Sequence, residues 1–473
     1  MENLKQAVNP YMPSWEYVPD GEPHVFGDRV YVYGSHDKFN GDVYCMLDYV
    51  CYSAPVDDLS TWRYEGVIYK KSQDPENGDL QGNLYAPDVT QGPDGRYYLY
   101  YVLSNRGNVS VAVCDTPAGQ YEFYGMVHYE DGTLLGAREG DEPQFDPGVL
   151  TEGDRTYLYT GFCAVGDKSR HGAMATVLGK DMLTIVEEPK FIVPGEAYSH
   201  GTQFEGHAFF EAPSIRKKDG KYWFIYSTQV CHELGYAISD KPTEGFTYAG
   251  VLVSNGDFHI DSYKPAEKPM FYCANNHGSL VQVKDSWYIF YHRHTNGTNY
   301  SRQGCFEKLR EKEDGTFDQA EITSCCSIAP LKGSGEYPTY IACNLFTDTE
   351  MAFVPWSGWM DDRFPKITQE GRDGDENLGY IANMRDSATA GFKYFDCKGI
   401  RAVGVRTKGY ANGEIEVRTA WDGEKLGGVP VHTSNEWMDH KADLMIPDGV
   451  NALYFTFKGT GHLQFAAFTL FTE

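Results

Sequence analysis

Acidic residues in three short, similar contexts are the part of this sequence whose types and neighbours suggest chemistry. Glu211 stands in FFEAPSI, Asp146 in FDPGVL and Glu22 in PDGEPH. The phenylalanines and the Ala-Pro pair around Glu211 predict burial, which disfavours the ionised form and keeps a carboxyl group protonated. Glu22 has polar and turn-forming neighbours, so we expect it to stay ionised. Hydrolysis of a glycosidic bond needs such a pair, one acid for the leaving oxygen and one carboxylate to activate water.

These acids belong to an internal repeat, which predicts how they come together. Five segments each run from a Pro or Gly through a short apolar stretch to a Gly/Asp turn and a Tyr-rich strand. They are EPHVFGDRVYVYGSHD, APDVTQGPDGRYYLYY, DPGVLTEGDRTYLYTG, APSIRKKDGKYWFIYS and HGSLVQVKDSWYIFYH, starting at residues 22, 86, 146, 212 and 277. Each centre is typical of a β-hairpin, and each unit has room for four short strands. Five such units predict an all-β fold, a five-bladed β-propeller; a sandwich with accidental hairpins is the alternative that the even spacing disfavours.

The first strand of each propeller blade lines the central channel, so equivalent positions of all blades converge at one end of the axis. The repeat therefore brings Glu22, Asp146 and Glu211 together with Asp88 and His277. Crowded carboxylates repel one another and raise each other's pKa. We accordingly expect Asp146 to raise the pKa of Glu211 further.

The motifs resemble those of glycoside hydrolase family 43, five-bladed propellers that act on arabinose- and xylose-containing glycans with inversion. The resemblance covers about residues 1–335 and implies that Glu211 is the general acid and Asp146 the modulator of its pKa. The family's base is an Asp in the first blade. Glu22 occupies that slot here and Asp20 lies two residues earlier, in VPDGEP. Glu22 is preferred as base because it is in register with Asp146 and His277, although its side chain is one methylene longer; Asp20 is the alternative.

The same resemblance implies further site residues. His277, in NNHGSL, is expected on the axis beside a water network or a calcium ion, and otherwise no cofactor is required. The segment YHRHTNGTNYSRQ supplies two arginines, of which one is expected to contact substrate hydroxyls, and aromatic residues flank the acids. The expected substrate-binding residues are Asp88, Phe145, Phe210, Arg293 and Arg302.

After about residue 335 the repeat stops and a second domain, residues 336–473, is predicted. Its alternating stretches, such as GFKYF and EIEVRTA, predict a jelly-roll-like β-sandwich. It resembles a family 6 carbohydrate-binding module in GFKYFDCKG and in the closing LYFTFKGTGHLQFAAFTLF. Gln464 stands where that family usually has Asn. Two roles stay open, sugar binding and packing on the propeller, and packing is preferred.

Composition excludes some classes of partner. The formal net charge is −26, whereas nucleic acids and anionic membranes select basic surfaces. Eleven scattered cysteines lack the C-x-x-C spacing of zinc sites, and the N-terminus lacks the apolar run of a signal peptide. We therefore expect a cytoplasmic protein with free thiols and an oligosaccharide substrate; its oligomeric state is not predicted.

Two functions from different classes follow from these patterns. The first is an inverting exo-glycosidase that releases a terminal α-L-arabinofuranose or β-D-xylose from plant-type oligosaccharides, with a galactofuranoside as the alternative substrate. The second is a catalytically silent glycan-binding protein, in which Glu22 at the base slot marks lost activity.

Overall fold

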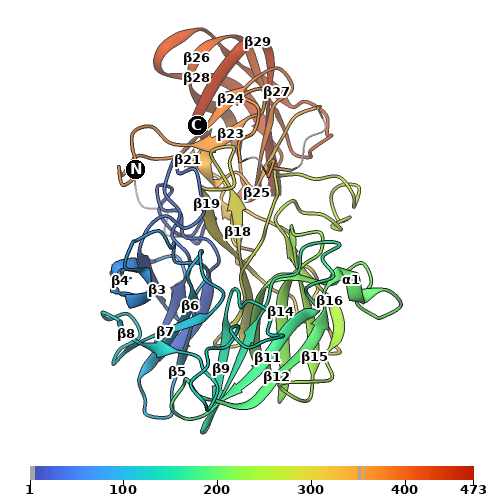
Figure 1. Cartoon of the computed structure of the whole chain (residues 1–473). Helices are drawn as coiled ribbons and strands as arrows, with labels where there is room; N and C mark the ends of the chain where they lie inside the picture. The colour runs from blue at the N-terminus through green and yellow to red at the C-terminus, as the bar shows by residue number, and fades with distance from the viewer. Residues whose placement is uncertain (1–5, 350–352, 357, 473) are drawn as a thin grey trace.

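The computed structural model describes residues 6–349, 353–356 and 358–472, which form a five-bladed β-propeller and a C-terminal sheet (Figure 1). The predicted all-β fold with a five-bladed propeller is confirmed. Helical structure within these residues is limited to short pieces: α1 (Glu196–Ser199), η1 (Lys71–Gln73), η2 (Pro75–Asn77) and η3 (Thr339–Ile341). None of the described helices is long and apolar enough to cross a membrane.

Each blade is an antiparallel sheet whose strands follow one another in chain order. The first blade consists of β1 (Glu22–Phe26), β2 (Arg29–Tyr33), β3 (Tyr49–Pro55) and β4 (Arg63–Tyr69). The second consists of β5 (Asp88–Gln91), β6 (Tyr97–Val102), β7 (Val109–Cys114) and β8 (Glu122–Met126). The third consists of β9 (Gly148–Glu152), β10 (Arg155–Thr160), β11 (Gly172–Leu178) and β12 (Ile185–Pro194).

The last two blades differ in strand number. The fourth consists of β13 (Phe209–Lys218), β14 (Lys221–Thr228), β15 (Glu233–Ser239) and β16 (Thr247–Ser254). The fifth has β17 (Leu280–Val283), β18 (Ser286–His294) and β19 (Arg302–Lys308). The five hairpins predicted from the repeat are therefore the inner two strands of each blade.

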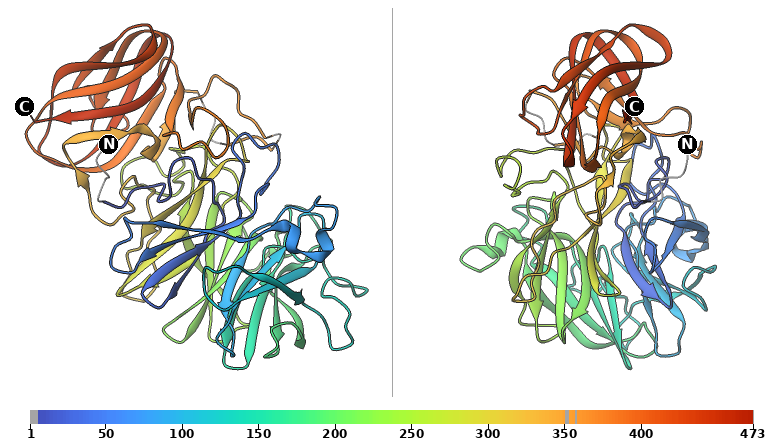
Figure 2. Two further views of the ribbon diagram at one scale, coloured as in Figure 1. Left: turned by 90° about the vertical axis from the view of Figure 1, so that its left-hand side faces the viewer. Right: turned by 180° about the vertical axis from the view of Figure 1, so that it is seen from behind.

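The first and fifth blades meet at the axis, where the ring of blades closes. Gly21 forms an isolated parallel bridge with Gly278, and β1 packs against β17. The blue strands of the first blade accordingly lie beside the yellow strands of the fifth in both views of Figure 2. A Cβ atom at Gly278 would lie 1.9 Å from the carbonyl oxygen of Phe290, so only glycine allows this approach. The contact places the residues around Gly21 next to those around Gly278.

Apolar and aromatic side chains fill the space between neighbouring blades. Between the first and second blades the cluster is rich in buried tyrosines, including Tyr33, Tyr49, Tyr69 and Tyr101. Tyr69 and Tyr101 share a hydrogen bond of 2.8 Å between their hydroxyl groups, which satisfies polar atoms that burial would otherwise leave unpaired. The high tyrosine content of the sequence is thus largely blade core.

The C-terminal part forms one sheet of ten strands. Figure 2 shows that this sheet is strongly curled. Its strands are β20 (Leu331–Lys332), β21 (Gly335–Pro338), β22 (Asn344–Phe346), β23 (Lys366–Thr368), β24 (Tyr380–Met384), β25 (Thr389–Cys397), β26 (Ile400–Arg418), β27 (Gly427–Val431), β28 (Ser434–Ile446) and β29 (Gly449–Phe471). The curl is consistent with the predicted sandwich. The sheet begins at Leu331, and the domain boundary at residue 335 stays a prediction.

The C-terminal sheet and the propeller share one hydrophobic core. A single cluster of buried side chains runs from Trp223 and Ile289 in the fourth and fifth blades to Phe392 and Phe468 in the sheet. Lys393 of β25 is fully buried and forms ion pairs of 3.2 Å with Asp257 and 2.8 Å with Glu321. These contacts support the packing role, whereas sugar binding by this sheet stays a prediction.

Candidate active site

A cavity of about 570 Å³ opens where the first strands of the blades converge. Three carboxyl groups line it, from Asp20 before β1, Asp146 before β9 and Glu211 in β13, together with His277 and Arg302. The residues come from four blades and meet only in the folded chain. Asp146, Glu211 and His277, which the repeat was expected to bring together, thus line one pocket.

Backbone geometry sets the three acids in place. Asp20 and Asp146 have φ of 58° and 45°, and Ala212, directly after Glu211, has φ of 61°. Left-handed conformations of residues other than glycine are strained and gather at functional sites. At Ala212 the strain coincides with a register shift between β13 and β14 on both sides of Glu211. The shift interrupts the regular ladder where the Glu211 side chain turns to the pocket.

Asp20 is held as an ionised carboxylate. Arg302 Nη1 donates a hydrogen bond of 3.0 Å to Asp20 Oδ1, and His292 Nδ1 lies 3.2 Å from the same oxygen. Burial opposes ionisation, but the Arg302 guanidinium, with His292, holds the pKa of Asp20 well below its usual range. Asp20 is therefore expected to be ionised near neutral pH, where it can accept a proton.

Arg302 is itself fixed from several sides. Its Nε and Nη2 donate to the two carboxylate oxygens of Asp37 at 2.8 and 3.0 Å, and the Tyr44 ring lies 4.8 Å from its Cζ. This bidentate pairing orients the guanidinium as well as neutralising it. The charge beside Asp20 is thus rigidly placed.

Glu211 and Asp146 have the opposite electrostatics. Burial, followed by the neighbouring Asp146 carboxyl group, raises the pKa of Glu211. Burial also raises the pKa of Asp146, against the opposing effect of the His277 ring. Two carboxyl groups so close cannot both ionise easily, so the pair retains a proton into the neutral range. The direction of the pKa shift of Glu211 is the one expected from its apolar neighbours, and its role as general acid stays a prediction.

His277 lies between the pocket and the part of the central propeller channel that contains Glu22. Its Nδ1 lies 3.7 Å from Asp146 Oδ2 and its Nε2 lies 3.6 Å from Glu22 Oε1. Burial disfavours the charged ring, but Glu22, Asp146 and Asp20 outweigh it and raise the pKa of His277 to about 9. The ring is therefore a cation shared by two carboxylates.

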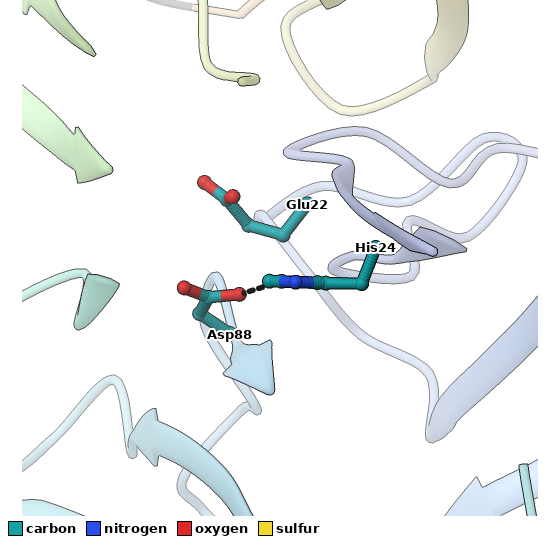
Figure 3. A group of neighbouring side chains, drawn as sticks. All are labelled: Glu22, His24 and Asp88. Atoms are coloured by element: carbon teal, nitrogen blue, oxygen red, sulfur yellow. Dashed lines mark hydrogen bonds and ion pairs between the residues drawn. The ribbon is translucent and has the colours of Figure 1, made fainter. Parts of the chain in front are cut away.

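Glu22 and Asp88 do not line the pocket, and the structure places them in the channel beyond His277. Figure 3 shows both carboxyl groups beside the His24 ring. Arg216 Nη2 donates to Glu22 Oε2 at 2.5 Å, and His24 Nε2 lies 2.6 Å from Asp88 Oδ1. Burial opposes ionisation of Asp88, but His24 and Arg216 hold its pKa below the usual range. The preference for Glu22 over Asp20 thus disagrees with their positions, because Asp20 faces the cavity and Glu22 faces a guanidinium.

Of the two predicted arginines, only Arg302 reaches the pocket. Arg293 is buried elsewhere and donates to Gln303 Oε1 at 2.8 Å and to the carbonyl oxygens of Tyr340 and Ala342 at 2.6 and 2.8 Å. It joins the fifth blade to the chain that enters the C-terminal sheet. Arg293 therefore contacts protein atoms where substrate contact was expected.

One wall of the pocket is aromatic. Phe145 packs against Tyr85 at 5.6 Å and against Phe162 at 5.3 Å, and Phe162 packs against Phe210 at 5.3 Å between ring centroids. All four line the cavity. Such a wall can contact the C–H faces of a sugar ring while the acids act on its oxygens. Phe145 and Phe210 thus line the cavity, and their predicted contact with substrate stays a prediction.

A calcium ion fits the residues around His277 poorly. Calcium prefers oxygen ligands, and a protonated imidazole is no ligand. In the channel, Glu22, His24 and Asp88 present ligand atoms within 4.8 Å of one another. The Arg216 guanidinium already provides a cation there, 2.5 Å from Glu22 and 4.0 Å from Asp88.

The sequence analysis did not identify Asp37, which orients Arg302, or Arg216, which pairs with Glu22. Asp37 ends the first repeat segment, in GSHD, and Arg216 lies five residues after Glu211, in APSIRKK. Their positions in the sequence do not predict which arginine pairs with which carboxylate. The need of a buried arginine for a buried partner is the one signal that could have suggested a residue such as Asp37.

Comparison with known proteins gives one consistent match. The family model described as "Glycosyl hydrolases family 43" matches residues 19–317, a range that includes all three pocket acids. A "Xylosidase/arabinosidase" from Thermoclostridium stercorarium is 66% identical over 471 residues, covering 99% of this chain and 100% of the relative.

Solved structures extend the match. The GH43_1 enzyme from Xanthomonas citri complexed with xylose is 26% identical, has a TM-score of 0.54, and covers 67% of this chain and 93% of that chain. A family 43 arabinoxylan arabinofuranohydrolase from Bacillus subtilis, in complex with cellotetraose, covers 99% of both chains at 20% identity and a TM-score of 0.53. The second similarity shows the fold, with the C-terminal sheet included.

Proposed function

The chain belongs to glycosyl hydrolase family 43, and we propose that this glycoside hydrolase releases a terminal β-D-xylose or α-L-arabinofuranose from oligosaccharides with inversion of configuration. One observation carries the proposal. Asp20 and Glu211 line the same cavity, where Arg302 lowers the pKa of Asp20 and burial raises the pKa of Glu211. Two acids with pKa values pushed apart are the signature of acid and base roles.

In the proposed mechanism the two acids act on opposite sides of one bond. Asp20 accepts a proton from a water molecule as that water attacks the anomeric carbon, and Arg302 and His292 keep Asp20 ionised beforehand. Glu211 gives its proton to the leaving oxygen. Asp146 keeps Glu211 protonated through repulsion and does not itself transfer a proton.

This assignment places the base at Asp20 and gives Glu22 a structural role. The glycan-binding alternative rested on Glu22 as an altered base. With Asp20 in the pocket wall, that reason no longer applies. The names of relatives support a pentose substrate, since one is a "Xylosidase/arabinosidase" and another structure holds xylose.

The test is a panel of aryl β-D-xyloside, α-L-arabinofuranoside and β-D-galactofuranoside substrates with wild type, Asp20→Asn, Glu22→Gln and Glu211→Gln. We expect turnover on a pentoside that is lost in Asp20→Asn, is strongly reduced in Glu211→Gln and persists in Glu22→Gln. Proton NMR of the first product reports its anomeric configuration, and retention would contradict the mechanism. Turnover on the galactofuranoside alone would move the substrate to that sugar.

The calcium ion implied by the family resemblance stays a prediction, and no step of the mechanism runs through it. The residues that would face such an ion are Glu22, His24 and Asp88, with His277 nearby. A chelator titration tests it.

We also propose that the enzyme works inside the cell on imported oligosaccharides. All eleven cysteines are free thiols and most are buried, which suits a reducing compartment. Cell fractionation with an antibody against the chain would check this.

A further inference from the structure

We propose that Trp356, which follows the propeller in sequence, forms the outer wall of the pocket and stacks on the sugar next to the scissile bond on the leaving-group side. The inference rests on the proposed function, because it assigns a specificity role within the same pocket. Trp356 lines the cavity together with the catalytic acids.

Exposure places Trp356 at the mouth. Most residues that line the cavity are buried or half-buried, whereas Trp356 is 65% exposed and Val165 is 61% exposed. An indole with that much apolar surface in water is costly unless something covers it. The acids lie deeper, near the axis, so a terminal sugar at the acids brings the following sugar to the mouth.

The chain on either side of Trp356 is fastened to the propeller. The backbone N–H of Val354 donates to the carbonyl of Cys273 at 2.9 Å, and that of Met360 donates to Gly297 at 2.6 Å. Val354 and Met360 are buried, at 4% and 9% exposure. The tryptophan is therefore exposed on a segment anchored at both ends.

A second set of contacts ties this segment to the pocket wall. Asn299 Nδ2 donates to the carbonyl of Pro355 at 2.9 Å. Gly358 has φ of 102° and packs so close to the Tyr300 ring that a Cβ would lie 2.8 Å from it. Tyr300 in turn packs edge-on against Tyr44 at 4.9 Å, and Tyr44 lines the cavity. An aromatic ring whose flanking residues already make such contacts loses little further entropy when a ligand stacks on it.

The recognised ligand is thus the pyranose or furanose ring of an oligosaccharide leaving group. A substrate whose leaving group has no ring gains nothing from Trp356. The platform therefore selects oligosaccharides over small glycosides without taking part in proton transfer.

The experiment compares Trp356→Ala with Trp359→Ala. Trp359 lies on the same segment, is 44% exposed and does not line the cavity, so it is a matched control. For the pentose identified by the aryl panel, kcat/KM is measured on the disaccharide and on the glycosyl fluoride, whose leaving group has no ring. We expect Trp356→Ala to lose about tenfold on the disaccharide, equivalent to about 1.4 kcal/mol, and to match wild type on the fluoride. Trp359→Ala should match wild type on both.

Equal losses on both substrates, or no loss on the disaccharide, would overturn the inference. If wild type hydrolyses neither substrate, the proposed function fails separately, and calorimetric titration of the disaccharide into wild type and Trp356→Ala still decides the platform. Equal affinities would then reject it. Trp356→Phe, which keeps a ring, should recover part of the lost selectivity in either assay.

Discussion

Two groups of buried acids lie on either side of His277, and they differ in how their charge is balanced. The channel group consists of Glu22, Asp88, His24 and Arg216, with a guanidinium on Glu22 and an imidazole on Asp88. On the pocket side, Asp146 lies beside His277, a cation that Glu22 shares, and Arg302 lowers the pKa values of Asp146 and Glu211 less than burial raises them.

The balance of charge around a buried acid decides whether that acid can exchange a proton near neutral pH. A carboxylate with its own cation gains stability from ionisation and has no reason to exchange protons near neutrality. A carboxyl group that is buried without sufficient positive charge keeps its proton and can give it to a substrate. Asp20 is the instructive exception, since Arg302 balances its charge and yet it faces the cavity, as a water-activating base must.

The largest effect is expected from Asp20. Asp20→Ala should lower kcat by about 10²–10⁴-fold, because Asp20 is the cavity carboxylate whose pKa is lowered, whereas burial raises the pKa values of Asp146 and Glu211. Azide, a small anionic nucleophile, should restore turnover by entering the vacated space, and the product should be a glycosyl azide of inverted configuration. Mass spectrometry and NMR of the product provide the measurement. Azide rescue of Glu22→Ala instead would return the base to Glu22.

The channel group should respond in stability rather than in rate. Arg216→Met leaves Glu22 and Asp88 buried beside each other without a guanidinium, which is expected to cost about 3–5 kcal/mol of unfolding free energy. Urea denaturation measures this loss, and kcat/KM should change only a few-fold at temperatures where the variant is folded.

The double variant Arg216→Met/Glu22→Gln is the matched control for that loss. It removes one carboxylate together with the guanidinium and should recover part of the stability. A large fall in kcat/KM for folded Arg216→Met, with unchanged stability, would erase the distinction between the two groups.

Sequence alone could predict the convergence of the acids but not their partners. The repeat placed Asp146, Glu211 and His277 at equivalent strand starts, and the apolar neighbours of Glu211 indicated its burial. The choice between Asp20 and Glu22 needed three dimensions, because both lie near the axis and only packing decides that Arg302 meets one and Arg216 the other. Arg293 and Arg302 lie in one segment, yet only Arg302 reaches the cavity, and the sequence did not predict which of the two would do so.

The fold followed from local patterns and the interface did not. Hairpins of alternating residues with Gly/Asp turns are local signals, so five blades could be counted. The shared core of the propeller and the C-terminal sheet, and the return of Trp356 to the pocket, depend on contacts between residues far apart in the chain. No periodicity in the segment around Trp356 indicates that it lines a cavity.

The pocket acids, unlike the channel group, should make the stability of the protein fall as the pH rises. Because the folded-state pKa of Glu211 is raised above its unfolded value, folding loses stability as the pH rises from the ordinary carboxyl range through that raised pKa. Glu211→Gln cannot ionise and should therefore be more stable than wild type by about 1–3 kcal/mol at pH 8 and little different at pH 4. Thermal denaturation at both pH values measures this, and a destabilised Glu211→Gln at pH 8 would contradict the assignment. In wild type the same ionisation should produce the alkaline limb of kcat/KM.

The smallest effect is expected from metal removal. This experiment tests whether Arg216, and not a metal ion, balances the charges of Glu22 and Asp88 in the channel. Glu22, His24 and Asp88 could present ligand atoms to one ion, but the Arg216 guanidinium already pairs with both carboxylates. Dialysis against a chelator should therefore leave kcat and the unfolding temperature of wild type unchanged. Calcium added to Arg216→Met meets two carboxylates that have lost the guanidinium and keep only imidazole partners, and it should raise the unfolding temperature of that variant but not of wild type. Loss of wild-type activity on chelation, restored by calcium, would show that a metal ion acts beside Arg216.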